Sequence, residues 1–237
     1  MLHQTSLAKA RAAYQPKLPA SLSVHSTANK TSLPSNTDTQ IQSLFPNTFN
    51  LPAVSFSSGT EAAKPAPIVV GVILSGGPAP GGHNVIAGIF DAIKQIHPES
   101  SLIGFRNGPD GLLTNNGTEI DAKLLAEYRN TGGFDIIGSG RTKLESEQDF
   151  LKALDTAKSR NLTALVVIGG DDSNSNASKL AEFAASRKAP LTIVGVPKTI
   201  DGEHRLIGNG NSIEAHDSAP GVTAGNGFDD VVTRFIA

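Results

Sequence analysis

Short apolar runs alternate with amphipathic segments through the middle of this 237-residue chain, and no other feature constrains the fold as much. The apolar runs, each a candidate strand, cover residues 68–74, 101–105, 134–140, 163–168 and 191–196. Apolar residues recur at helical spacing after three of these runs, over residues 85–96, 150–157 and 177–184. Strands that alternate with helices form βαβ units, whose crossover helices cover both faces of a parallel sheet. The sequence therefore predicts a Rossmann-like α/β fold with helices on both faces of the sheet.

The rest of the chain differs in composition from this α/β segment, which we place at residues 68–203. Residues 1–67 hold half of the 14 prolines and show little periodicity, which is typical of an extended arm. The motif LFPNTF at 44–49 is a candidate anchor for this arm. Residues 204–237 contain five glycines and no strand–helix alternation, which predicts a loop-rich tail.

Charge and composition exclude several classes of protein. The formal net charge is −2 and no stripe of Lys and Arg is present, so we expect no nucleic-acid partner. The longest apolar run, residues 68–74, is far too short to cross a bilayer, so we expect no membrane partner. The absence of cysteine excludes disulfides and thiol catalysis, and it fits a reducing compartment.

The start of the chain has an unusual charge pattern. No acidic residue precedes Asp38, while Lys9, Arg11, Lys17 and Lys30 are scattered among Ser, Thr and Ala. This composition overlaps with that of organellar transit peptides. A solvated arm is the alternative interpretation, and composition alone leaves both open.

Loops that follow the predicted strands should carry the chemistry, because parallel sheets bind ligands at the carboxyl ends of their strands. The first such loop, SGGPAPGGHN at 75–84, leads into a helix. Its glycines let the backbone approach a ligand, and the helix N-terminus offers free N–H groups to a phosphate. A structural turn is the alternative, since the loop has neither the GK[ST] ending of a Walker loop nor the GxGxxG dinucleotide pattern.

The second loop, within GGDDSNSNA at 169–177, carries two neighbouring carboxylates, Asp171 and Asp172. These side chains would repel a bare phosphate, but Mg²⁺ commonly bridges one or two carboxylates to substrate phosphates. Capping of the following helix is the alternative role, for which one carboxylate would suffice. The pair therefore favours a magnesium–phosphate site.

The third loop, PKTIDGE at 197–203, brings Lys198, Thr199 and Asp201 to the same edge of the sheet. A lysine can neutralise phosphate charge, and an aspartate can accept a proton from a hydroxyl nucleophile. An ordinary polar turn is the alternative. Three such loops on one sheet edge favour phosphoryl transfer, with a glycine cradle, Mg²⁺, a lysine and an aspartate base.

Together the three loops resemble the phosphofructokinase family, and within it the long-form, pyrophosphate-dependent branch. ATP-dependent members carry GGDGS and PGTIDND where this chain has GGDDS and PKTIDGE, so Asp172 and Lys198 stand in place of two glycines. The similarity, which covers residues 6–203, extends over GVILSGGPAPGGHNVIAGIFD, GGFDIIGSGRTK, LFPNTF and LAKARAAYQPKLP. It implies the fold of a phosphofructokinase N-terminal domain, and the match of the arm favours a cytoplasmic protein over a transit peptide.

The resemblance implies roles for the matching residues of the first two loops and for Arg141, in GSGRTK. Gly76, Gly77 and Arg141 would hold the phosphoryl donor, which is pyrophosphate in this branch. Asp171 would bind Mg²⁺ as the metal cofactor. Asp172 would fill the space that the α-phosphate of ATP needs, and would so exclude ATP by bulk and charge.

The resemblance also implies roles for the third loop. Lys198 would stabilise the charge on pyrophosphate in the transition state, and Asp201 would be the base that activates the 1-hydroxyl of fructose 6-phosphate. Thr199, Ile200 and Glu203 would contact this sugar substrate. The implied reaction gives fructose 1,6-bisphosphate and phosphate, a reversible step of glycolysis, in a family with allosteric members.

The chain departs from the family in two ways. Glu203 stands where the family has Asp, and no MGR-type motif follows, so we expect most of the sugar-phosphate half to be missing. Two hypotheses stay open: a catalytic phosphotransferase, assembled with full-length subunits as a homo- or hetero-oligomer, and a non-catalytic remnant that binds Mg-pyrophosphate or a partner without turnover. A nucleotide-binding module of the lipid- or NAD-kinase type is disfavoured, because PKTIDG has no role there.

Overall fold

The central element of the computed structural model is one sheet with strand order β5-β4-β3-β7-β8, in which β6 also pairs with β3. The structure describes residues 5–14, 16–23, 25–31, 39–60, 65–198, 205–208 and 211–214. The strands of the sheet are β3 Val69–Ser75, β4 Ser101–Phe105, β5 Gly117–Glu119, β6 Ser139–Gly140, β7 Ala164–Gly169 and β8 Thr192–Pro197. Every pair is parallel except β4 with β5, so the sheet is mixed at one edge only.

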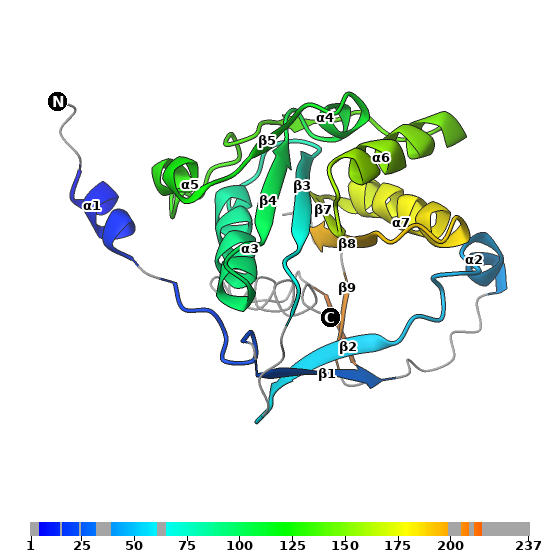
Figure 1. Ribbon diagram of the computed structural model, residues 1–237, viewed down its shortest axis with the longest axis horizontal. Helices are drawn as coiled ribbons and strands as arrows, with labels where there is room; N and C mark the ends of the chain where they lie inside the picture. Colours follow the sequence, from blue (N-terminus) through cyan, green and yellow to red (C-terminus); the bar gives the residue numbers. More distant parts are fainter. Residues whose placement is uncertain are drawn as a thin grey trace.

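Helices cover both faces of this sheet, as predicted. They are α3 Gly82–Ile96, α4 Pro109–Leu113, α5 Ala122–Tyr128, α6 Glu147–Ser159 and α7 Asp171–Ser186. Figure 1 shows α3 and α5 on one face of the sheet and α6 and α7 on the other. Because side chains alternate along a strand, Val72 and Leu74 of β3 join the core beside α3, whereas Ile73 joins the core beside α6 and α7. The α/β prediction is therefore confirmed, with the antiparallel strand β5 as an addition.

The predicted strand at 134–140 is wrong over most of its length, because only the two residues of β6 pair with β3. The backbone N–H groups of Asp135 and Ile136 donate instead to Nε2 of His83, at 2.9 and 3.0 Å. Gly138 has a left-handed φ of 65°, which also breaks the extended conformation. A buried side chain on α3 thus takes the hydrogen bonds that a strand would have made.

Three elements between β4 and β6 have no counterpart in the sequence predictions. These elements are α4, β5 and α5, which have five, three and seven residues. Segments of this length span two helical turns at most, so neither helical nor strand periodicity is visible in them. Their existence follows from packing against the sheet, where Leu112 and Leu125 are fully buried.

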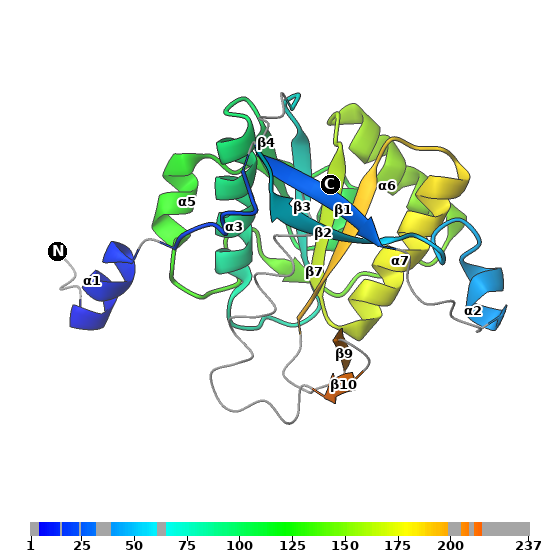
Figure 2. The ribbon, with the colours of Figure 1, turned by 90° about the horizontal axis from the view of Figure 1, so that it is seen from below.

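Residues 1–67 contain more regular structure than the expected extended arm. The arm consists of α1 Ser6–Ala13, β1 Ser26–Thr31, α2 Thr39–Leu44 and β2 Ala53–Ser58. The strands β1 and β2 pair antiparallel and form a two-stranded ribbon. Figures 1 and 2 both show this ribbon lying across one end of the sheet, separate from it. The helices α1 and α2 depart from the expected extended conformation, whereas β1 and β2 are extended strands whose pairing was not predicted. The strand β1 gave no periodic signal because nearly all of it is exposed.

The arm is attached to the helices on both faces of the sheet. On one side Leu22, which is 1% exposed, packs against Ala92 of α3. On the other side the Glu182 carboxylate of α7 accepts hydrogen bonds from the backbone N–H groups of Asn47 and Thr48 and from the Thr48 hydroxyl. Burial raises the pKa of Glu182, but the hydrogen bonds from Asn47 and Thr48 outweigh it and hold this pKa below its ordinary value. The candidate anchor LFPNTF therefore does anchor the arm.

Residues beyond β8 include a hairpin that the sequence did not predict. The strands β9 Arg205–Gly208 and β10 Asn211–Glu214 pair antiparallel, so the expected loop is wrong for these eight residues. The overlooked signal is the Asn-Gly pair between them, which two-residue hairpin turns favour. The boundaries at 67 and 203 stay predictions. None of the described helices is long and apolar enough to cross a membrane.

Glu182→Ala should release the arm from α7 without unfolding the sheet domain, because this carboxylate is the acceptor for the turn at 47–48. We expect severalfold faster cleavage within residues 39–60 in limited proteolysis. Glu127→Ala, at an exposed position on α5, is the matched control. Equal cleavage of both variants would contradict this role of Glu182.

The same contact should depend on pH. The pKa of Glu182 is lowered in the folded chain, so its stabilising effect is complete above the ordinary pKa of a glutamate. The effect is lost as the pH falls through the lowered value. Limited proteolysis at decreasing pH should therefore show earlier release of the arm than unfolding of the sheet, which near-ultraviolet circular dichroism would follow.

Candidate functional site

The order in which the chain adds strands to the sheet reverses between β3 and β7. From β3 the chain continues to β4 on one side, and it later returns to β7 and β8 on the other side. Such a switch leaves a crevice at the carboxyl ends of the strands. A pocket of about 600 Å³ lies at this position. Its lining residues are 75–79, 141–143, 170–173, 176 and 198.

Two glycines after β3 form one wall of the pocket. Gly76 has a φ of 86°, a backbone conformation that favours glycine. A methyl group on Gly76 would point towards Lys198 Nζ and Ser173 Oγ, each 3.8 Å away. A methyl group on Gly77 would lie 3.0 Å from Nη2 of Arg141, so the guanidinium rests close to the glycine backbone. The structure therefore brings the first and third predicted loops together with Arg141.

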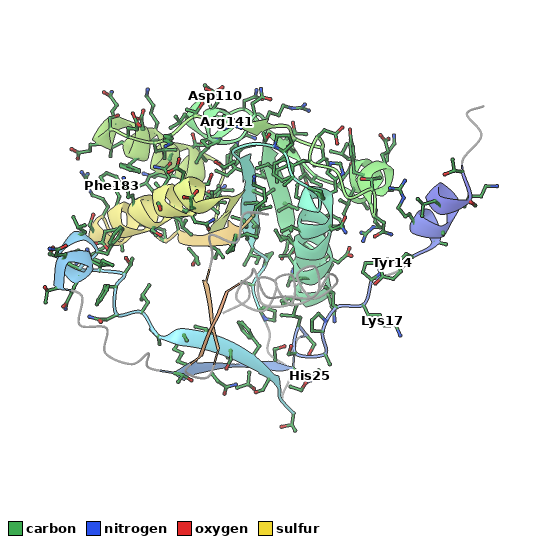
Figure 3. The ribbon with its side chains drawn as sticks, turned by 180° about the vertical axis from the view of Figure 1, so that it is seen from behind. Tyr14, Lys17, His25, Asp110, Arg141 and Phe183 are labelled. Carbon is green, nitrogen blue, oxygen red and sulfur yellow. The ribbon has the colours of Figure 1, made fainter. Side chains whose placement is uncertain are left out.

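The pocket and the arm ribbon lie at opposite ends of the domain. Figure 3 shows Arg141 and Asp110 at one end, and His25, which immediately precedes β1, at the other. Asp110 belongs to α4, which follows the carboxyl end of β4. The ribbon therefore does not contribute to the pocket wall.

Helix α7 begins at the pocket, with Gly170 as its N-cap and Asp171 and Asp172 as its first residues. Gly170 has no side chain to cap the helix, so the positive end of the helix dipole faces the pocket. Nδ2 of Asn174 donates to the carbonyl oxygens of Gly169 and Gly170, at 2.7 and 2.8 Å. These hydrogen bonds fix the turn that precedes the two carboxylates.

The two neighbouring carboxylates have different environments. Oδ2 of Asp172 lies 2.8 Å from Nζ of Lys143, and this hydrogen-bonded ion pair lowers the pKa of Asp172 and raises the pKa of Lys143. The Asp171 carboxylate is exposed and accepts no hydrogen bond from any residue that the structure describes. Of the two, Asp171 is therefore the one whose oxygens are available to a ligand.

The described part of the chain holds no group of three His, Asp or Glu side chains that could bind a metal by itself. Mg²⁺ does not require one, because it keeps several waters and is commonly bound by one or two carboxylates together with substrate phosphates. A single available carboxylate, Asp171, at the edge of an otherwise cationic pocket fits this kind of site.

Lys198 reaches the glycine loop from the end of β8. Its Nζ donates to the carbonyl oxygen of Gly77 at 2.6 Å and lies 5.6 Å from the ring centre of Phe134. Its backbone N–H donates to Gly169 at 2.8 Å, which ties the ends of β7 and β8 together. The other predicted residues of this loop, Thr199, Ile200, Asp201 and Glu203, lie outside the described residues.

A buried histidine holds the segment that carries Phe134. His83 is 1% exposed, and its Nε2 accepts two backbone N–H groups, so the proton of the neutral ring is on Nδ1, which faces Thr131 Oγ1 at 2.6 Å. Burial lowers the pKa of His83, although the nearby Asp135 carboxylate acts to raise it. The neutral ring therefore has a structural role, which orders the backbone beside Lys198.

Two residues that shape the pocket, Asn176 and Lys143, are absent from the sequence predictions. Oδ1 of Asn176 accepts the N–H of Leu144 at 3.0 Å, and its Nδ2 donates to the Leu144 carbonyl at 2.7 Å. Leu144 is buried, so the loop that carries Arg141 and Lys143 is fixed against α7. Lys143 is visible in the motif GRTK, but its partner on α7 becomes apparent only in the fold.

The fold and the pocket together define an α/β protein whose ligand site lies at the topological switch point of its sheet. The sequence profile of one such family, phosphofructokinase, matches residues 69–207, more than half of the chain. The chain therefore belongs to the phosphofructokinase family, and the resemblance seen in its loops is confirmed.

Several curated relatives are pyrophosphate–fructose 6-phosphate 1-phosphotransferases. The protein from Porphyromonas gingivalis is 50% identical over 202 residues, which cover 84% of this chain and 37% of the relative. Subunit beta 1 from Arabidopsis thaliana is 46% identical over 165 residues, which cover 69% of this chain and 29% of the relative. Subunit alpha from Solanum tuberosum is 35% identical over 212 residues, which cover 84% of this chain and 34% of the relative. The chain thus spans about a third of the length of these relatives.

Solved structures of the family share the fold at lower sequence identity. The pyrophosphate-dependent phosphofructokinase of Nitrosospira multiformis aligns with a TM-score of 0.53 and 22% identity, over 60% of this chain and 35% of that chain. The phosphofructokinase of Pichia pastoris in the T-state aligns with a TM-score of 0.51 and 25% identity, over 60% of this chain and 16% of that chain. The similarity supports the observed strand order.

Asn176→Ala should lower the free energy of unfolding by about 1–3 kcal/mol, because both backbone groups of Leu144 lose their partner in a half-buried position. Denaturant unfolding of the whole chain measures this loss. Ser175→Ala, at an exposed position on the same helix, is the control and should change stability by less than about 0.5 kcal/mol. Equal stability of the two variants would contradict the anchoring role.

Proposed function

We propose that this chain carries the donor site of a pyrophosphate-dependent phosphofructokinase. The reaction moves a phosphoryl group from pyrophosphate to the 1-hydroxyl of fructose 6-phosphate, and gives fructose 1,6-bisphosphate and phosphate. The observation that carries the proposal is the meeting of Gly76, Asp171, Asp172 and Lys198 in one pocket. The names of the relatives support the choice of donor and acceptor.

Backbone groups and cationic side chains would hold pyrophosphate. The Gly76–Gly77 backbone admits a close approach, and the uncapped end of α7 offers N–H groups and a positive dipole end. Arg141 and Lys198 reach the glycine loop from two other segments, so positive charge surrounds it. Phosphoryl transfer needs this arrangement, because its transition state is stabilised mainly by positioning and by charge.

Asp171 would hold Mg²⁺. When bound together with pyrophosphate, this ion would neutralise the charge that develops on the donor oxygens. Asp172 would exclude ATP by its bulk, since its side chain lines the same pocket as the glycine loop. Lys198 would stabilise the departing phosphate through its fixed ammonium group.

Asp201 would accept the proton of the sugar hydroxyl, with Thr199, Ile200 and Glu203 as contacts to fructose 6-phosphate. These four residues lie outside the described part of the chain, so their roles rest on the motif.

Asp201→Asn should reduce turnover by about 10²–10⁴-fold, since general base catalysis typically contributes this much. A coupled assay for fructose 1,6-bisphosphate, with pyrophosphate as donor, measures the loss. Calorimetric binding of Mg-pyrophosphate should be unchanged, because the motif assigns this residue to the acceptor sugar and not to the donor. A variant with full turnover would refute the role of Asp201 as the base.

Replacing Asp172 and Lys198 together by glycine should admit ATP as the donor, because it removes the bulk and charge that distinguish the two branches of the family. The assay is the ratio of turnover with ATP to turnover with pyrophosphate, measured in the presence of a full-length family subunit. Asp110→Gly, outside the pocket lining, is the control. Continued rejection of ATP would refute the gatekeeper role of Asp172.

A second candidate function is binding of Mg-pyrophosphate, or of a full-length subunit, without turnover. The observation that favours it is that this chain spans about a third of the length of its relatives. Pyrophosphate binding without product formation by the chain alone, and without any increase over the turnover of the Porphyromonas gingivalis relative when the two are mixed, would select this candidate. Turnover by the chain alone, or an increase in the mixture, selects the first. We place both candidates in the cytoplasm, as the arm motif and the absence of cysteine suggest.

A further inference from the structure

Lys143 bridges two of the segments that form the pocket. It follows β6 in the loop that also carries Arg141, and its Nζ lies 2.8 Å from Oδ2 of Asp172 in the first turn of α7. Both residues line the pocket. The ion pair therefore lies at the site where the two predicted carboxylates would meet a polyanion.

The backbone holds Lys143 in this position. The next residue, Leu144, is 4% exposed and makes two backbone hydrogen bonds with the side chain of Asn176. Asn176 lies four residues after Asp172, which places the two side chains on the same face of α7. The lysine thus starts from a fixed point beside the helix and extends along it towards Asp172.

The pair contributes little to the stability of the fold. The side chains of Lys143 and Asp172 are 51% and 73% exposed. Because water and salt screen the attraction between exposed charges, such ion pairs add little to the free energy of unfolding. A contact with a well-fixed backbone and little effect on folding points to a role in the pocket itself.

The charges of the pocket explain what that role is. Three cationic side chains and two carboxylates line it, so its formal charge is +1. Arg141 and Lys198 lie at the glycine loop. Nη2 of Arg141 is 3.0 Å from the position of a Cβ on Gly77, and Nζ of Lys198 is 2.6 Å from the Gly77 carbonyl oxygen. Lys143 extends to the start of α7, where it is hydrogen-bonded to the Asp172 carboxylate. Without it the lining would be neutral, and Asp172 would face the ligand with its full charge.

We propose that Lys143 is a charge-compensating residue for the diphosphate donor: by pairing with Asp172, it allows a pocket with two carboxylates to bind a polyanion. Lys143 offsets the charge of Asp172, so that Asp172 would exclude ATP by its bulk alone. This inference rests on the proposed function, since it assumes that the pocket binds pyrophosphate. The competing role, a direct contact between Lys143 and a phosphate, makes a different prediction.

The test is a double-mutant cycle on the whole 237-residue chain, with binding of inorganic pyrophosphate in the presence of Mg²⁺ measured by calorimetry. Lys143→Met should weaken binding about tenfold, because it leaves Asp172 unpaired beside the ligand. In an Asp172→Asn background the same change should alter binding by less than about threefold, because the carboxylate that pairs with Lys143 has lost its charge.

Three controls separate this role from others. Lys143→Arg keeps the charge and should restore binding to within about threefold of the unaltered chain. Lys179→Met removes a lysine that also attracts Asp172 but does not line the pocket, and it should leave binding unchanged. The melting temperature of every variant shows whether the fold is intact.

Two results would overturn this inference but leave the proposed function intact. Equal weakening by Lys143→Met in both backgrounds would assign Lys143 a direct phosphate contact, and unchanged binding in the unaltered background would leave it no role. In both cases the proposed function stands, because the unaltered chain binds pyrophosphate. Absence of binding by the unaltered chain would overturn the inference together with the proposed function.

Discussion

The parallel pairing of β3 with β7 is the constraint on which the pocket depends. Its register places Leu74 opposite Ile168, so the two strands end at the same level. The hydroxyl of Ser173 donates to Ser75 Oγ at 2.8 Å and joins the loops that follow. A Cβ on Gly169 would lie 2.3 Å from that of Ser173, so this approach requires glycine. A shift of one residue in register would turn every side chain to the other face and separate the loops.

At the ends of the paired strands β3 and β7, the pocket combines fixed backbone groups with variable side chains. The glycine loop and the uncapped start of α7 supply N–H groups whose positions follow from the fold. A substitution cannot remove these groups, so in the proposed function the side chains would make the choice between donors. Asp172 and Lys198, the two residues to which the family resemblance assigns this choice, both line the pocket. A change of donor would then need no change of fold.

The sequence allowed the prediction of those parts whose structure follows from local pattern. The strands β3, β4 and β7 are apolar runs that are mostly buried between two helix layers, and β8 is an apolar run at the edge of the sheet. The loops that follow β3, β7 and β8 placed Gly76, Asp171 and Lys198 at one edge. The segment 134–138 could not be predicted, because its backbone bonds to His83, a residue about 50 positions away. Nothing local distinguishes an apolar segment that pairs in a sheet from one held by a side chain.

The same reasoning explains why Lys143 was missed. Its pairing with Asp172 depends on the side of the sheet on which β6 ends, and on the rotation of α7. Both are consequences of tertiary packing. Residue type showed that charges gather at this edge of the sheet, but only the fold shows which of them cancel.

Helix α7 links the two ends of the domain. Its first turn carries Asp171 and Asp172, and its last turns carry Glu182, which holds the arm. Eleven residues of a helix span about 16 Å, and a packed helix moves as a rigid body. The position of α7 is fixed at one end by the sheet and Asn176, and at the other by the arm. The arm and the pocket therefore contact opposite ends of one helix, and no arm residue that the structure describes lines the pocket.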